Sequence, residues 1–305
     1  MVQTDKTLAG KKQGLFVGLV TLDFIYQAER LPTSNQKIVA SDYIVSAGGP
    51  ATNAAVTFKH LGGVATVLGV LGRHPITQLI LADLQQVGVT IADLAPNYSE
   101  PPSVSSAIVT AATGERAVVS INAVKNQATK ASIPVDCLQD TDIVLIDGHQ
   151  MNVGREVAQQ AKSQGIPIVV DGGSWKPGFE PVLSLTDYAI CSANFRPPGC
   201  ENAEDVMVYL SGLGIPHIAI THGDQSIHYR HQNRSGWVEV PPIKAVDTLG
   251  AGDIFHGAFC SAILQEEFVE ALSSAARIAA HSCQFFGTRP WMSSATSQSK
   301  LSGED

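Results

Sequence analysis

Charged residues are scarce in this sequence: Asp, Glu, Lys and Arg together make up 16% of its 305 residues. Basic residues are the rarer sign, with 20 Lys and Arg against 28 Asp and Glu, so the formal net charge is −8 at pH 7. The longest basic run is Lys11-Lys12. Because binding to a nucleic-acid backbone depends on clustered Lys and Arg, we expect no nucleic-acid partner.

Cysteine pairs and long apolar runs are also missing. The five cysteines are scattered and form no C-x-x-C pair, which argues against a disulfide framework or a zinc site and favours reduced thiols in the cytoplasm. The apolar run "LFVGLV" near the start soon meets Asp23, so it is too short for a membrane span or an export signal. We therefore expect a cytoplasmic protein with no membrane partner.

What the sequence does contain is an alternation of short apolar runs and helical patterns. The runs "GLFVGLVTL", "VATVLGVLG", "DIVLID", "IPIVVD", "DYAIC" and "HIAIT" are continuously hydrophobic, as expected of parallel strands covered on both faces. Segments with helical period lie between them, around 51–61, 76–87, 153–164 and 201–213. The pattern predicts an α/β fold with a doubly wound, mostly parallel sheet flanked by helices, which binds ligands at the carboxyl ends of its strands.

Two stretches, 36–49 and 103–122, break this rhythm with alternating apolar and polar residues. They predict a small β-sheet appended to the main body as a lid, with "ATGER" as a hairpin turn in the second stretch. We expect one domain over 14–292, with polar, aperiodic and flexible tails at 1–13 and 293–305.

The segment "AVDTLGAGDIFHGAF" (245–259) places a glycine-rich turn at the start of a helical pattern. Gly250 and Gly252 let backbone N–H groups converge, and a helix N-terminus favours an anion. Asp253 in the first turn fits two interpretations, a simple helix cap or a base beside a phosphate cradle. The residues alone leave both open.

"DTLGAGDIFHGAF" resembles the C-terminal signature of the ribokinase-like (PfkB) sugar kinases, written D-T-x-G-A-G-D. The resemblance implies that Asp253 is the general base for the acceptor hydroxyl, and that Gly250, Ala251 and Gly252 form an anion hole. It also assigns Thr248 to the nucleotide side, while Asp247 holds the loop or a cation. Phosphoryl transfer fits this set, since it relies on positioning, charge neutralisation and one base.

A second segment, "SAGGPATNAAVTFKHLGG" (46–63), is similar to the N-terminal family pattern G-G-x-x-x-N-x-A. By itself it would be an ordinary strand-to-helix turn, but its pairing with the later motif favours a sugar site. The resemblance then implies sugar contacts by Gly48, Gly49 and Asn53, and by Asp23 after the first strand.

The resemblance extends to a nucleotide site and therefore implies ATP. "THGDQS" is similar to the family's T-x-G-x-x-G loop, with Ser226 in place of the last glycine, and "AARIAAHSCQFFGTRP" (275–290) is similar to the segment that flanks the adenine. The residues implied outside the catalytic turn are Asn194, Thr221, Gly223, Ser226, His281 and Gly287.

One departure from the family concerns Mg²⁺. Many members carry N-x-x-E, but here Asn194 is followed by Pro197 where the Glu would stand. We expect Mg²⁺ because ATP needs it, with Asp187 or water in place of the missing acid and no dedicated protein metal site. A monovalent cation such as K⁺ is a further expectation.

Lys37, on the expected lid strand, fits either a sugar contact or a solvated charge at a sheet edge. Its surroundings resemble ketohexokinase-like and sulfofructose-kinase-like members, which favours a ketose or a related sugar. An exposed lid sheet also predicts a homodimer formed through the lid.

Three alternatives remain open. A nucleoside kinase of the same fold would need apolar lid residues, which Tyr43, Ile44 and Val45 could supply. A sugar- or nucleotide-binding regulator with weakened catalysis would fit the missing N-x-x-E acid, although Asp253 argues against it. A dinucleotide oxidoreductase is disfavoured, because no G-x-G-x-x-G follows the first strand.

Overall fold

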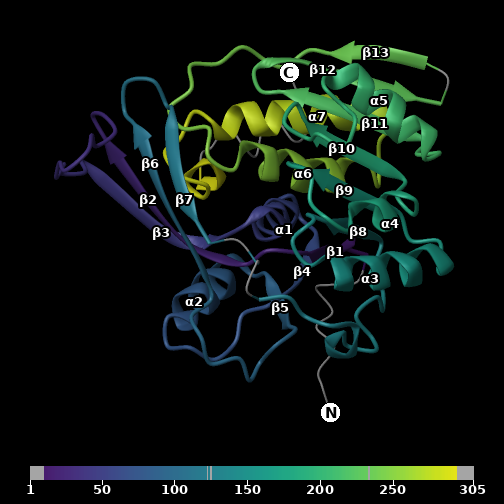
Figure 1. Cartoon of the computed structure of the whole chain (residues 1–305), viewed down its shortest axis with the longest axis horizontal. Helices are drawn as coiled ribbons and strands as arrows, with labels where there is room; N and C mark the ends of the chain where they lie inside the picture. Colours follow the sequence, from purple (N-terminus) through teal and green to yellow (C-terminus); the bar gives the residue numbers. More distant parts are fainter. Residues whose placement is uncertain (1–9, 122, 124–125, 233, 294–305) are drawn as a thin grey trace.

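The computed structural model describes residues 10–121, 123, 126–232 and 234–293 (Figure 1). A nine-stranded sheet with helices on both faces forms the body, and a four-stranded sheet projects from one side of it. The predicted fold class, a mostly parallel sheet with a small β lid, is confirmed.

The body sheet explains the continuously apolar runs of the sequence. The strands from β5 to β11 in the spatial order are parallel, and β12 and β13 extend the sheet as antiparallel strands. Both faces of the central strands are covered, so each residue of β8 and β9 is buried. In spatial order the strands are β13 (Arg234–Val238), β12 (Gln225–His231), β11 (His217–His222), β10 (Tyr188–Ser192), β9 (Ile168–Gly172), β8 (Ile143–Ile146), β1 (Gln13–Val17), β4 (Val64–Gly69) and β5 (Thr90–Asp93).

Two hydrophobic clusters divide the helices between the faces of the body sheet. One face is covered by α1 (Pro50–His60), α2 (Thr77–Val87), α6 (Ala251–Ala262) and α7 (Phe268–Ser282). The other is covered by α3 (Met151–Ser163), α4 (Phe179–Leu183) and α5 (Ala203–Gly212). The described residues also include the short 3-10 helices η2 (Lys130–Ser132) and η3 (Pro290–Ser293). The four helical segments predicted from periodicity correspond to α1, α2, α3 and α5.

The lid is a mixed sheet in the order β3 (Asp42–Gly48), β2 (Thr21–Ala28), β6 (Ser103–Thr110) and β7 (Arg116–Ser120). β2 and β6 are parallel, and the outer pairs are antiparallel. The predicted hairpin between β6 and β7 is confirmed, closed by a 2.8 Å bond from the Thr110 N–H to the Glu115 carbonyl.

The structure corrects three predicted boundaries. Residues 36–41 are not a strand, because pairing with β2 begins at Asp42 and a left-handed turn at Asn35 (φ 59°) directs the chain into a loop. The run "GLFVGLVTL" is not one strand: it leaves the body sheet after Val17 and enters the lid at Thr21. The predicted tails are slightly too long, because Gln13 already belongs to β1 and Ser293 to η3. Most of the remaining tail residues, 1–9 and 294–305, lie outside the described residues.

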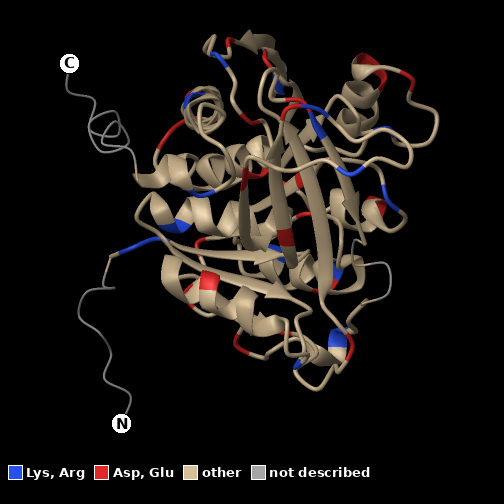
Figure 2. Ribbon diagram, turned by 90° about the vertical axis from the view of Figure 1, so that its left-hand side faces the viewer, with Lys and Arg blue, Asp and Glu red and all other residues tan. Residues whose placement is uncertain are grey.

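Seen from the lid side, Lys and Arg residues are scattered over the described part of the ribbon and form no continuous basic stripe (Figure 2). No helix in the described part of the chain is both long and apolar enough to cross a bilayer.

Candidate active site

The glycine-rich turn leads directly into α6, as its sequence predicts. Gly250 is the N-cap residue in the left-handed conformation (φ 72°), which glycine adopts without strain, and its carbonyl accepts the first helical bond from Ile254 at 2.8 Å. Among the described residues no side chain caps α6; the Ala251 N–H donates to the Thr248 carbonyl at 3.3 Å, so an anion at this helix end would rely mainly on the neighbouring N–H groups of the turn. A Cβ on Gly252 would meet nothing within 4 Å, so the turn is open on that side.

Asp253 lies in the first turn of α6, partly buried, and is oriented by α1. The side-chain amide of Asn53 donates from Nδ2 to Asp253 Oδ2 at 2.9 Å. Burial and the nearby charge of Asp171 raise the pKa of Asp253 to about 7, although the Asn53 bond acts in the opposite direction. A carboxyl group with this pKa exchanges a proton close to neutral pH.

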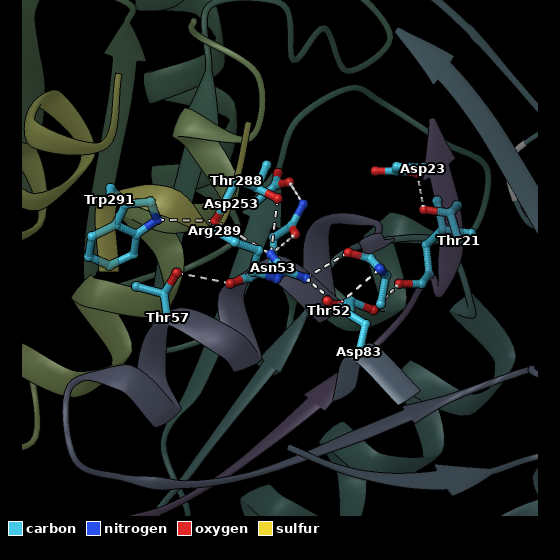
Figure 3. Close-up of polar contacts among 12 residues, drawn as sticks. Thr21, Asp23, Thr52, Asn53, Thr57, Asp83, Asp253, Thr288, Arg289 and Trp291 are labelled. Carbon is cyan, nitrogen blue, oxygen red and sulfur yellow. Dashed lines mark hydrogen bonds and ion pairs between the residues drawn. The ribbon is translucent and has the colours of Figure 1, made fainter. Parts of the chain in front are cut away.

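Arg289 fixes the other end of the Asn53 amide. Its Nη1 donates to Asn53 Oδ1 at 3.0 Å, so the amide presents its NH₂ group to Asp253. Its Nη2 donates to the Ala47 carbonyl at 2.6 Å and lies 3.3 Å from Asp83 Oδ2 on α2. These bonds connect the C-terminal loop with α1 and α2 beneath the turn (Figure 3).

Asp23 is on the lid strand β2, 8% exposed and apart from the Arg289 cluster (Figure 3). Its Oδ1 accepts from Thr21 Oγ1 at 2.5 Å and from Ser105 Oγ at 2.7 Å. Burial raises its pKa despite these bonds. A Cβ on Gly48 would lie 1.9 Å from Asp23 Oδ2, so only glycine fits there. Next to Asp23 across the β2–β3 pair is Ser46, whose buried Oγ has no hydrogen-bond partner among the described residues.

Asp247 holds the turn in place. Its Oδ1 accepts from the Leu249 N–H at 2.8 Å, and its Oδ2 accepts from the Gly287 N–H at 2.9 Å. Burial raises its pKa, which these bonds and Arg116 oppose. The loop-holding role expected for Asp247 agrees with this geometry.

Two groups behind the turn were not identified from the sequence. His256, one helical turn after Asp253, places Nδ1 2.7 Å from the Gly252 carbonyl and 3.6 Å from Asp171 Oδ2. Its Nε2 lies 3.2 Å from the Ile190 carbonyl. Asp171 is the penultimate residue of β9 and is 6% exposed, and burial raises its pKa although His256 opposes that effect. Together they place a buried acid and an imidazole under the anion turn.

Asp147, directly after β8, binds two of the connections between body and lid, β1 to β2 and β3 to α1. Its Oδ2 accepts from the Leu19 N–H at 2.8 Å and from the Ala51 N–H at 3.1 Å. Burial alone would raise its pKa, but His149, with Nδ1 at 3.3 Å, and backbone N–H bonds lower it. A Cβ on Gly18 would lie 2.0 Å from this carboxylate.

Three of the residues predicted for the nucleotide, Asn194, Thr221 and Gly223, lie at or just after the carboxyl ends of β10 and β11. Asn194 follows β10 and Thr221 is in β11, and the Ala193 N–H bonds the Thr221 carbonyl at 2.9 Å. Gly223 turns with φ 69° before β12, which contains Ser226. His281 is in the last turn of α7, and Gly287 lies in the following loop with φ 80°.

Some predicted residues are not brought to this site. Lys37 lies exposed in the loop before β3, beyond the Gln27–Asp42 end of the lid pairing, whereas Asp23 and Gly48 lie toward its opposite end. Asp187 precedes β10 and is bonded to Lys162 at 2.7 Å and to the Ile168 N–H at 3.0 Å, at the amino ends of the strands. It therefore cannot replace the missing N-x-x-E acid. In the described part of the chain, no group of three or more His, Cys, Asp or Glu is arranged to hold a metal ion.

The comparison with known proteins decides the family. The pfkB carbohydrate kinase family model matches residues 11–295. The chain belongs to the pfkB family of carbohydrate kinases. Membership of this pfkB family makes it an ATP-dependent sugar kinase, as expected from the two motifs.

Relatives of this pfkB kinase include several ribokinases. The chain is 24% identical over 286 residues to ribokinase of Bacillus subtilis, covering 90% of this chain and 94% of the relative. A putative ribokinase from Agrobacterium tumefaciens superposes with a TM-score of 0.82 at 25% identity, covering 91% and 93% of the two chains. Arabidopsis thaliana ribokinase, solved with ribose and ATP, superposes with a TM-score of 0.75 at 21% identity over 97% and 99%.

Proposed function

We propose that this kinase transfers the γ-phosphoryl group of ATP to a sugar hydroxyl, with Asp253 as the general base. The observation that carries the proposal is the Asn53–Asp253 pair beside the open N-terminus of α6, where burial raises the Asp253 pKa to about 7. A base with this pKa is ionised in a large fraction at neutral pH yet still accepts a proton readily.

The reaction assigns separate tasks to the two sides of the turn. Asp253 accepts the proton of the acceptor hydroxyl, whose oxygen forms the new bond to phosphorus while the bond to ADP breaks. The N–H groups of Gly250, Ala251 and Gly252 would bind the charge on the moving phosphoryl group, with that of Ala251 giving up its 3.3 Å bond to the Thr248 carbonyl. Asn53 keeps Asp253 oriented through the 2.9 Å bond.

Sugar hydroxyls would be held where lid and body meet. Asp23 has its Oδ1 engaged by Thr21 and Ser105 and contacts Gly48, while Gly49 begins α1 with φ 96°. The buried and unpartnered Oγ of Ser46, beside Asp23, is a further donor or acceptor for a hydroxyl among the described residues. This set is polar and, apart from Asp23, uncharged, as a neutral sugar requires.

ATP would extend from the turn toward the carboxyl ends of β10 and β11. The proposed contacts are Asn194, Thr221, Gly223, Ser226, Thr248, His281 and Gly287. Mg²⁺ supplies charge neutralisation on the phosphates when it is bound. Because Pro197 is buried and Asp187 is remote, phosphate oxygens and water would provide most of its ligands, as Mg²⁺ commonly accepts. A requirement for K⁺ stays a prediction.

The acceptor we propose is ribose or another pentose. Two features support this choice over the ketose expected from sequence: the relatives are named ribokinases, and Lys37, which suggested the ketose, lies in a loop away from Asp23. The nucleoside alternative loses support as well, because Tyr43 is 66% exposed and Val45 is on the same outer face of the lid.

A second copy of this chain is the partner we propose for the outer face of the lid. Tyr26 pairs with Tyr43 and with Ile108 there, and Val119 is 78% exposed on the same face. Exposed apolar residues in one row of a sheet favour a protein interface. The homodimer predicted from sequence is retained on this basis.

The experiment that tests the proposed function is ATP turnover against a panel of acceptors containing ribose, other pentoses, ketoses and nucleosides. Turnover with a pentose at a kcat/KM well above the ketoses supports the proposal. A ketose or nucleoside preference would replace the substrate, and sugar binding without turnover on any acceptor would favour the regulator.

A further inference from the structure

The β6–β7 hairpin of the lid reaches over to the turn that contains Asp253. Arg116, the first residue of β7, donates from Nη1 to Thr248 Oγ1. Gly114 in the hairpin turn lies so close that a Cβ there would be 3.1 Å from the Val246 carbonyl. A lid residue and the phosphoryl-transfer turn are therefore in direct contact.

An apolar contact supports the same approach. Ile25, Ala107 and Val109 form a buried cluster on the inner face of the lid, against which Ile44, Leu249 and Phe286 pack. Arg116 is opposite Val109 in the β6–β7 pairing, so its side chain leaves the same inner face. The position of the guanidinium group is thus set by the packing of the lid and by the bond to Thr248.

The charge of Arg116 is not neutralised locally. No Asp or Glu oxygen within the described ranges lies within 4.0 Å of its guanidinium nitrogens, and its side chain is exposed. Its positive charge nevertheless acts on the turn: burial raises the pKa of Asp247, and the charge of Arg116 opposes that rise. Of the five N–H donors of a guanidinium group, the bond to Thr248 uses one.

An unneutralised guanidinium group beside the open amides of α6 has the chemistry to bind a phosphoryl group. Arginine offers a planar fork that matches two phosphate oxygens, and the turn supplies backbone N–H groups from the other side. We propose that Arg116 is a catalytic residue contributed by the lid, which binds the γ-phosphoryl oxygens during transfer to the sugar. This inference rests on the proposed function of the turn.

With Arg116 included, the bonds formed and broken in the chemical step are the same as before. The oxygen of the acceptor forms its bond to the γ-phosphorus, the bond to the oxygen of the leaving ADP breaks, and the hydroxyl proton passes to Asp253. Arg116 forms no covalent bond and moves no proton. It stabilises the charge spread over the phosphoryl oxygens, which is greatest at the transition state.

Because Arg116 belongs to the lid, its position couples phosphoryl transfer to closing of the lid. Because the guanidinium group belongs to β7, it is at the turn only when the lid packs on Leu249 and Phe286. A lid that closes on a bound sugar would complete the phosphoryl site at that moment and limit ATP hydrolysis by water.

The competing explanation is that Arg116 only docks the hairpin on Thr248. Arg116→Gln separates the two, because an amide can still donate to Thr248 but has no charge and no fork. Arg30→Gln is the matched control, since Arg30 is also a lid arginine but bonds Gln36 at the distant loop. The measurements are kcat, the Kd of ADP and the Kd of ADP with aluminium fluoride, a mimic of the phosphoryl group in transfer, all with the acceptor present.

We expect Arg116→Gln to lower kcat by about 100- to 1,000-fold, as does removal of one donor to a developing oxyanion. ADP affinity should change by less than about 3-fold, and affinity for ADP with aluminium fluoride should fall in parallel with kcat. Guanidinium ions added to Arg116→Ala should restore part of the lost turnover, and Arg30→Gln should remain within about 2-fold of the wild type.

Two outcomes would overturn the proposal. One is that Arg116→Gln loses no more activity than Arg30→Gln. The other is an equal loss of affinity for ADP with and without aluminium fluoride, which would mark a docking role. A failure of the proposed base is recognised separately: it would leave Asp253→Asn active whatever Arg116→Gln does.

Discussion

Asn53 and Asp253, 200 residues apart in the chain, are joined by a 2.9 Å hydrogen bond from Nδ2 to Oδ2. The bond unites the two glycine-rich motifs, because Asn53 belongs to α1 and Asp253 to α6. Arg289 determines which end of the Asn53 amide faces the carboxylate. The base proposed for phosphoryl transfer is therefore oriented by a second motif and by a third segment near the C-terminus.

Asp253→Asn should lower kcat by about 100- to 10,000-fold, because the acceptor hydroxyl loses its base while the fold and the ATP site remain. The affinity for ATP should stay within a few-fold. Steady-state kinetics and calorimetry with ATP measure both quantities, and Asp136→Asn, at an exposed position, serves as the control. Turnover near the wild-type rate in Asp253→Asn would remove Asp253 from the mechanism.

The pH profile of kcat/KM should rise with pH and level off above about 7, since Asp253 must be ionised to accept a proton and its pKa is raised to about 7. Asp171→Asn should shift this rise to lower pH, because the charge of Asp171 contributes to raising the Asp253 pKa. Initial rates from pH 5 to 9 at low sugar concentration measure the shift. An unmoved profile would mean that another group titrates.

Asp253→Asn should also stabilise the folded protein, and more at pH 8 than at pH 5. The folded-state pKa is raised from 3.8 to about 7, so between these values the unfolded chain loses a proton that the folded chain retains, and stability falls as pH rises. Removing the ionisable group removes that loss, by about 1–3 kcal/mol at pH 8. Urea unfolding at both pH values tests the sign, and a smaller gain at pH 8 than at pH 5 would contradict it.

Arg289→Met should cost roughly 3 kcal/mol of unfolding free energy, because it leaves Asn53 Oδ1, the Ala47 carbonyl and Asp83 without their donor. Asp83→Asn should cost less, since Arg289 keeps its other acceptors. The double variant should lose less than the sum of the two single losses. Denaturant titration of the three variants measures these terms, and simple additivity would argue against a shared network.

Val119→Asp should convert the proposed dimer to a monomer, because it places a charge in the exposed apolar row on the outer face of the lid. Sedimentation velocity of wild type and variant measures the change. Val208→Asp, on α5 of the body and also exposed, is the matched control and should leave the state of association unchanged. A wild-type protein that sediments as a monomer would contradict the proposed homodimer.

Much of the body could be predicted because its strands and helices have distinct local periods. The boundary between β1 and β2 could not, since the run around Gly18 stays apolar while the chain passes from one sheet to the other. Lys37 was misplaced because residues 36–41 alternate like a strand, whereas the pairing with β2 begins only at Asp42 and the chain before it turns at Asn35.

The glycines and Asp253 were predictable because their motifs are contiguous in sequence. Arg289 was not, because nothing local indicates that a single arginine after a helix will be 13% exposed and will contact α1 and α2. Arg116 depends on how the lid packs. His256 is different: its spacing of three from Asp253 places both on one face of a helix, a signal that the sequence did contain.

Asp147 helps to separate the sugar site into a part that can move with the lid and a part that stays with the body. By bonding Leu19 and Ala51, it anchors the body end of two of the four chain crossings, β1 to β2 and β3 to α1, so a lid movement would bend these two crossings at Val20 and at the Gly48–Gly49 step. Asp23 moves with such a movement of the lid, whereas Asn53 and Asp253 stay with the body. Opening would therefore separate the lid contacts of a bound sugar from its body contacts. The phosphorylated product could then leave without any rearrangement inside the lid or inside the body.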